Sequence, residues 1–160
     1  RSSDSVAKPF LCLQIGGAEH RFAKTNERSG VISVKWNGPR KEWLGTAFGF
    51  QTHLVLRGEA GTVAHAQLVL AGGMIMLGEG SGHEGDEYER INSTPNEIDG
   101  INTMGVYLFI EQIDTHYERA KAAGARMVLD IQDQAYGGRG YTCTDLEGHL
   151  WSFGSYDPWA

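Results

Sequence analysis

The sequence predicts an α+β fold made of two copies of one βαβββ module. From Val31 onward, apolar segments of strand length are separated by glycines and interrupted by two short helical stretches. The order of these segments recurs, because one constant shift along the chain places Val31 on Val106 and Gly49 on Gly124. A repeat of this length is typical of duplicated modules packed together, since solenoid repeats are shorter and more numerous. We therefore expect two sheets that face a shared cleft.

The second module, residues 105–160, is the clearer copy. Asp114 is a suitable N-cap for a helix that ends at Gly124, where glycine permits the left-handed stop. Asp145-Leu-Glu-Gly148 reads as a tight turn between the last two strands. The expected strands are residues 106–110, 125–131, 140–145 and 149–155.

The first module, residues 31–78, follows the same order. Pro39 suits the first turn of a helix that runs to Phe48, and Gly49 suits its end. The expected strands are residues 31–36, 50–56, 63–70 and 74–77.

Two segments fall outside the repeat. Residues 79–104 are rich in glycine and acidic residues and read as a linker between the modules. Residues 1–30 match neither module, and they could be an added strand, a dimer arm or a non-native remnant. The chain as a whole has the size of one domain.

The composition excludes several classes of partner. A net charge of −6 argues against nucleic acid, which requires clustered Lys and Arg, and favours a cationic or neutral ligand. No apolar run approaches the length of a membrane span, and the polar N-terminus does not resemble a signal peptide. Cys12 and Cys143 lie far apart and form no metal-binding or disulfide pattern, so a reducing cytoplasm is the simplest expectation.

Several motifs resemble the glyoxalase/bleomycin-resistance/dioxygenase (vicinal oxygen chelate) superfamily over about residues 30–156. In the second module these are Ile113-Asp-Thr-His-Tyr-Glu-Arg-Ala-Lys-Ala-Ala-Gly-Ala125, the glycine-rich stretch 136–141 and the stretch 145–153. Residues 43–50, 61–68 and 73–78 look like the matching parts of the first module. The resemblance implies paired βαβββ modules around a U-shaped cleft, frequently in a homodimer.

The resemblance also predicts where a metal would bind. Metal-dependent members place His, Gln or Glu on the first and last strands of each module, because a divalent ion needs several convergent donors. Counting from the helix-stop glycines and the closing hairpins, these positions fall at Gly30, Gly105, Met76 and Ser152. We therefore expect no metal at the standard site and no other cofactor, as in the metal-free branch of the family.

A cleft without a metal is predicted to bind a small organic molecule through aromatic and thioether side chains. Arg139 lies in a flexible glycine-rich loop and could clamp an anionic or carbonyl group. The register of residues 31–36 stays open: either Ser33 and Lys35 lie beneath the helix, or the strand is shifted by one. The predicted ligand-binding residues are Trp36, His65, Met76, Tyr107, Phe109, Arg139, Tyr141 and Ser152.

Two functions are compatible with these residues, beside a third possibility, an interaction module that uses its sheet edges and N-terminal arm for dimerisation alone. The first is a binding protein that holds a small, aromatic or cationic molecule without turning it over. The second is a glyoxalase-like lyase, isomerase or dioxygenase with a non-standard site, which needs a metal or a general base. Candidates for the base are His65, Glu79, Glu111 and Glu147. His149 is expected to face solvent, and Cys143 is expected to be a buried structural thiol.

Overall fold

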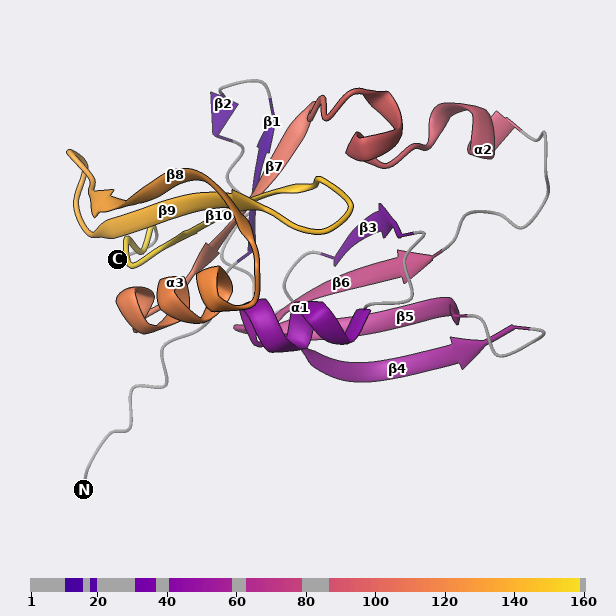
Figure 1. The fold of residues 1–160 in the computed structure, drawn as a ribbon, viewed down its shortest axis with the longest axis horizontal. Coiled ribbons are helices and arrows are strands. Elements are labelled where there is room, and N and C mark those ends of the chain that lie inside the picture. Colours follow the sequence, from indigo (N-terminus) through magenta and orange to yellow (C-terminus); the bar gives the residue numbers. More distant parts are fainter. Residues whose placement is uncertain are drawn as a thin grey trace.

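The computed structural model describes residues 11–15, 18–19, 31–36, 41–58, 63–78 and 87–158. Two β-sheets dominate the structure, and two of its helices lie side by side where the sheets approach each other (Figure 1). Among these residues, none of the helices combines the length and apolarity needed to cross a membrane. The predicted α+β class is confirmed.

The first module forms a four-stranded sheet in the order β3-β6-β5-β4. β3 and β6 are parallel, and the other neighbouring strands are antiparallel. Gly49, at φ 85°, ends the helix as predicted. The elements are β3 (Val31–Lys35), α1 (Lys41–Phe48), β4 (Gln51–Arg57), β5 (Val63–Leu70) and β6 (Gly73–Gly78).

The second module repeats this topology in the strand order β7-β10-β9-β8. Its first and last strands are again parallel, and Gly124, at φ 87°, follows its helix. The predicted βαβββ order is thus present in both halves. The elements are β7 (Met104–Phe109), α3 (Ile113–Ala122), β8 (Arg126–Asp133), β9 (Arg139–Thr144) and β10 (Leu150–Gly154).

The segments outside the repeat also contain regular structure. β1 (Leu11–Ile15) pairs antiparallel with β7 and extends the second sheet, followed by the short β2 (Ala18–Glu19). The described residues of the segment 1–30 therefore include an added strand, which is one of the three alternatives given for it. The linker contains α2 (Glu87–Ile91) and the 3-10 helix η2 (Pro95–Ile98).

One core joins the two modules. Side chains on alternate strand positions are buried on the helix-facing side of each sheet, as expected for half-buried strands. Phe48 of α1 reaches across the boundary, with its ring 5.6 Å from that of Trp151 and 4.8 Å from that of Phe153 in the second sheet. The two modules therefore share their interior.

Helices α1 and α3 also cap each other's C-terminal carbonyl groups, which have no partner within a helix. The indole Nε1 of Trp43 donates to the carbonyl of Ala123 (2.8 Å), and Arg119 Nε donates to the carbonyl of Ala47 (3.2 Å). These reciprocal bonds fix the angle at which the modules meet.

His116 of α3 lies at the centre of this contact. Its Nε2 is 2.9 Å from the carbonyl oxygen of Phe48, and its Nδ1 is 2.6 Å from the hydroxyl of Tyr141. Because a carbonyl can only accept, Nε2 carries the proton and Nδ1 accepts from Tyr141. Burial, with a smaller contribution from the positive charge of Arg119, lowers the pKa of His116 to about 4. The imidazole is therefore neutral in the folded protein.

The register of β3, which the sequence left undecided, is shifted by one residue relative to that of β7, its counterpart in the second module. Ser33 pairs with Met76, and Ile32 pairs with Ile75, which is buried on the helix-facing side. Lys35 does not lie beneath the helix, since its ammonium is 3.5 Å from Glu97 in η2. This register avoids burying a lysine without a charge partner.

Candidate functional site

A hollow of about 200 Å³ lies on the side of the second sheet that faces away from the helices. We call it the tyrosine pocket, because four tyrosines from separate segments border it. Strands β7–β10 supply its floor, and residues after β8 and β10 supply its rim. Its lining residues are Tyr107, Leu129, Gln132, Gln134, Tyr136, Arg139, Gly140, Tyr141, Thr142, Ser152, Phe153, Gly154 and Tyr156.

Strand alternation creates the polar floor of this pocket. Ser152 of β10 pairs with Thr142 of β9, and their hydroxyl oxygens are 3.0 Å apart. Their neighbours Trp151 and Cys143 are buried on the opposite side of the sheet. Because successive side chains point to opposite faces, one strand pair supplies both the core and the hydroxyls of the pocket.

The segment after β10 is held against the pocket by two contacts. The hydroxyl of Tyr107 donates to the carbonyl of Tyr156 (2.7 Å). A Cβ at Gly138, where φ is 69°, would lie 2.7 Å from the backbone nitrogen of Tyr156, so glycine is required for this approach.

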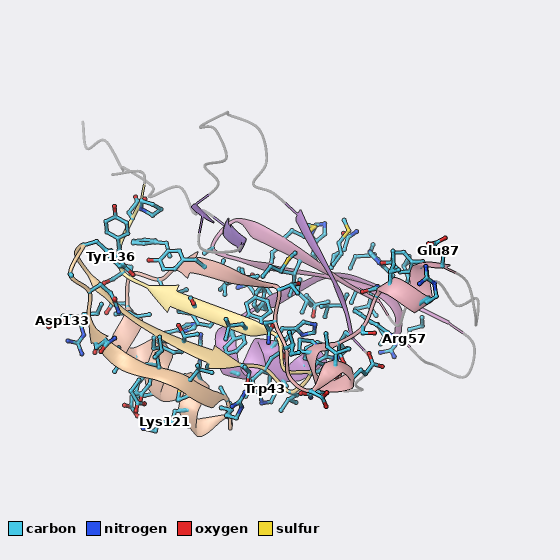
Figure 2. All side chains as sticks on the ribbon, turned by 90° about the horizontal axis from the view of Figure 1, so that it is seen from above. Trp43, Arg57, Glu87, Lys121, Asp133 and Tyr136 are labelled. Atoms are coloured by element: carbon cyan, nitrogen blue, oxygen red, sulfur yellow. The ribbon has the colours of Figure 1, made fainter. Side chains whose placement is uncertain are left out.

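Tyr136 completes the rim at one end of the molecule, as Figure 2 shows. Its ring contacts that of Tyr156 edge to face, with centroids 5.1 Å apart and an interplanar angle of 71°. The side chain of Tyr136 is 62% exposed, so a ligand could gain apolar burial there.

The charge that borders the pocket is already neutralised. Arg139 Nη1 is 2.6 Å from Asp133, and its Nε is 3.2 Å from Asp114 at the start of α3. The hydrogen bond to Asp133 and the nearby carboxylates raise the pKa of Arg139 above its usual value. No Asp or Glu occurs among the lining residues that the structure describes. The lining therefore suits a neutral molecule.

Four of the predicted ligand-binding residues border the tyrosine pocket. Tyr107 and Ser152 line it with side chains on the open side of the sheet. Arg139 borders it, but its guanidinium is held by Asp114 on the helix side. Tyr141 also borders it, although its hydroxyl contacts His116 on that same side.

The structure places the other four elsewhere. Trp36 is buried in the core and stacks on His149, with centroids 6.3 Å apart. Phe109 ends β7 and is half-buried. His65 and Met76 lie in β5 and β6 of the first sheet, where Gln67 pairs with Met76 and its amide nitrogen is 3.2 Å from His65 Nε2.

The expected metal positions carry poor ligands in the structure. Gly105 has no side chain, Met76 offers a thioether and Ser152 a hydroxyl, while Gly30 lies outside the described residues. Divalent ions in proteins are bound mainly by carboxylate, imidazole and thiolate donors. Within the described ranges, no group of three His, Cys, Asp or Glu side chains could hold a metal ion. The residues present do not fit a divalent ion at the standard site.

The candidate general bases do not gather at the tyrosine pocket. His65 belongs to the first sheet, Glu111 is exposed just before α3, and Glu79 lies outside the described residues. Burial, together with the negative charge of Asp145, raises the pKa of Glu147, which follows β9. A base acting at this pocket would have to come from another residue.

Cys143 is buried as predicted, and burial raises the pKa of its thiol to about 12. This disfavours the reactive thiolate. The prediction that His149 faces solvent is wrong, because its side chain is only 14% exposed and its Nδ1 is 3.1 Å from Asp145. The contact with the buried carboxylate of Asp145 holds the His149 ring away from solvent.

Sequence reasoning did not assign Thr142, Tyr136 or Tyr156 to the site. Thr142 could have been found, because a hairpin turn at Asp145–Gly148 brings it opposite Ser152. Tyr136 and Tyr156 have no periodic signal, since each lies in a loop whose path depends on Gly138 and the Tyr107 hydroxyl.

Comparison with known proteins identifies the family. Residues 40–153 match the Glyoxalase/Bleomycin resistance protein/Dioxygenase superfamily. This chain belongs to that superfamily. An uncharacterized protein of Mycobacterium bovis is 30% identical over 101 residues, which cover 61% of this chain and 61% of that protein. A similar protein of Mycobacterium tuberculosis strain H37Rv is matched over 55% of its length. The match thus spans less than two thirds of either mycobacterial protein.

Solved structures show the same fold. TioX from Micromonospora sp. ML1 is 30% identical, with a TM-score of 0.57 over 78% of this chain and 94% of TioX. A glyoxalase/bleomycin resistance protein from Streptomyces sp. CB03234 is 16% identical, with a TM-score of 0.56 over 78% of this chain and 96% of that chain. The fosfomycin resistance protein FosX from Listeria monocytogenes is 19% identical, with a TM-score of 0.53 over 84% and 97% of the two chains.

Proposed function

We propose that this superfamily member binds a small aromatic molecule in the tyrosine pocket, without a metal and without chemical turnover. The observation that carries the proposal is the lining, in which four tyrosines border the pocket whose floor carries the hydroxyls of Thr142 and Ser152. Aromatic walls with a few convergent polar groups are typical of small-molecule sites. Bleomycin resistance proteins belong to the same superfamily, which is consistent with sequestration of a toxic compound.

The size of the pocket limits its ligand. At about 200 Å³ it is smaller than the ~300–1,000 Å³ usual for drug-sized ligands. We expect it to enclose one planar ring system, while the rest of a larger ligand lies over Tyr136 and Tyr156. A neutral ring fits better than a cation. The chain has a net charge of −6, but none of the described lining residues is an Asp or Glu that could pair with a cation.

The test is a thermal-shift series with three matched probes, combined with elemental analysis of the purified protein. A ligand that binds the folded state must raise the apparent stability. We expect indole to raise the melting temperature more than tryptamine or indole-3-acetate, and added Zn²⁺ or Ni²⁺ to have no comparable effect. A larger rise in melting temperature with tryptamine would mean that the pocket prefers a cationic ligand to a neutral one. Stoichiometric metal in the protein would overturn the metal-free proposal.

A homodimer is part of the same proposal. Leu54 and Leu56 of β4 leave apolar surface exposed on the first sheet, and such surface favours association. Light scattering coupled to size exclusion should give twice the chain mass, and a Leu56→Glu variant should shift it toward the monomer.

A further inference from the structure

A second and larger hollow, of about 530 Å³, lies where the linker meets both modules. We call it the junction pocket. It shares no lining residue with the tyrosine pocket. Figure 2 places Glu87 of the adjoining α2 and Tyr136 at opposite ends of the molecule. Its lining residues are Lys35, Arg90, Ile91, Asn92, Ser93, Pro95, Ile98, Ile101, Asn102, Thr103, Met104, Val106, His149, Leu150 and Trp151.

Apolar side chains dominate the outer part of this hollow. Ile91, Ile98, Ile101 and Met104 are between 42 and 69% exposed, although they border a concave surface. Burying a side chain of this size contributes on the order of 1.5–3 kcal/mol when it is complete. A cluster of exposed apolar groups beside a hollow is typical of a binding site. The body of a ligand here is therefore apolar.

His149 supplies a hydrogen-bonding group at the inner part. Its Nδ1 faces Asp145, whose fully buried carboxylate also accepts from Trp151 Nε1 (2.8 Å) and from the backbone nitrogens of Glu147 and His149 (2.9 Å each). Because a carboxylate can only accept, the neutral imidazole of His149 carries its proton on Nδ1 and donates it to Asp145. Among the described residues, none hydrogen-bonds to Nε2 of His149. This nitrogen remains available to a ligand.

The plane of the imidazole is fixed as well. Trp36, which is buried, stacks on the His149 ring at an interplanar angle of 15°. A held ring loses little conformational entropy when it binds a ligand, so the acceptor is preorganised.

The two charged residues of the lining, Lys35 and Arg90, do not favour a charged ligand, because each is paired with a glutamate. Lys35 is paired with Glu97 at 3.5 Å, and Arg90 is paired with Glu87 at 2.8 Å. An anionic ligand would have to compete with these carboxylates. A hydroxyl group, in contrast, can donate to Nε2 of His149 without disturbing either pair.

We propose that the junction pocket is a second binding site, which takes a small neutral molecule with an apolar body and a hydroxyl head, such as an alkylphenol. The apolar body covers the isoleucines, and the hydroxyl donates to Nε2 of His149. This site is independent of the function proposed for the tyrosine pocket.

The test follows backbone amide NMR shifts while 4-propylphenol is titrated into the full chain. Shifts are expected at Asn102, Met104 and Leu150, and 4-propylanisole, which lacks the hydroxyl proton, should bind about threefold to tenfold more weakly, as for the loss of one hydrogen bond. Shifts confined to Tyr107 and Ser152 would overturn the proposal, as would equal affinity for the two compounds.

Two variants separate the head from the body of the ligand. His149→Phe keeps a stacking ring but removes the acceptor, and it should abolish the preference for 4-propylphenol over 4-propylanisole. Ile101→Ser should weaken both compounds, whereas Val128→Ser, at a residue of β8 that is 46% exposed and lines neither pocket, should weaken neither. An unchanged preference in His149→Phe, or unchanged binding in Ile101→Ser, would contradict the site.

Discussion

The two sheets have the same topology and share one interior, but their open sides differ. On the helix-facing sides, Phe48 of the first module packs against Trp151 and Phe153 of the second. On the open sides, the second sheet carries tyrosines and paired hydroxyls, while the first carries Met76 opposite Gln67, whose amide contacts His65. The buried positions maintain the duplicated fold, and the alternate positions give the two sheets open sides of different chemistry.

The largest effect should come from breaking the shared interior. Phe48→Ala is expected to destabilise the protein by about 3–5 kcal/mol, as for other buried aromatic truncations. Because the ring contacts the second sheet, both modules should unfold in one transition in urea, followed by circular dichroism and by tryptophan fluorescence, since Trp43 lies in the first module and Trp151 in the second. Two separate transitions would mean that the modules are independent.

A pH titration tests the same interior through His116. Its pKa is about 4 in the folded protein and near 6.5 in the unfolded chain, so the unfolded chain binds the extra proton between these values. This contribution is fully present above pH 6.5 and is lost as the pH falls toward 4. The expected loss is about 3 kcal/mol, measured by urea unfolding across this range.

His116→Gln is the matched control for this titration. An amide can still donate to the Phe48 carbonyl and accept from the Tyr141 hydroxyl, but it does not titrate in this range. The pH dependence below 6.5 should therefore be smaller in the variant. An identical profile in both proteins would show that other groups cause the acid destabilisation.

The difference between the open sides is tested by two ligand-binding variants. Tyr136→Ala should weaken indole binding about fivefold, because one aromatic contact contributes about 1 kcal/mol to the free energy of binding. Met76→Ala, on the first sheet, should leave the affinity unchanged, and Tyr88→Ala is the control for an exposed tyrosine outside the pocket. Calorimetric titration measures all three, and a loss confined to Met76→Ala would reverse the assignment.

The smallest expected effect concerns the reciprocal caps of the helices. Trp43→Phe retains most of the ring but removes the donor to the Ala123 carbonyl. We expect a loss of about 1 kcal/mol in the free energy of unfolding, typical of one hydrogen bond. No loss would indicate that water replaces the indole nitrogen at this carbonyl.

The sequence predicted the fold well because its signals are local or periodic. The glycines at 49 and 124 end the two helices at positive φ, and the alternation in β10 separates Trp151 from Ser152. The register of the first strand was ambiguous, because apolar residues occupy both odd and even positions along it. The face that lies beneath the helix is decided by the contact of Lys35 with Glu97 in the linker, which the sequence does not reveal.

The site was predicted only in part, because its residues are assembled by distant contacts. Tyr107 and Ser152 follow from strand parity. The direction of Arg139 depends on Asp114 and Asp133, which lie on other elements, and the position of Tyr136 depends on a loop. Such contacts leave no pattern along the chain.

The most direct test of the central claim is a map of backbone amide shifts during titration of indole into metal-free protein. We expect saturable shifts at the amides of Tyr107, Thr142 and Ser152, and no shift at those of His65 and Met76. Shifts centred on His65 and Met76, or binding that appears only after a divalent metal is added, would contradict it.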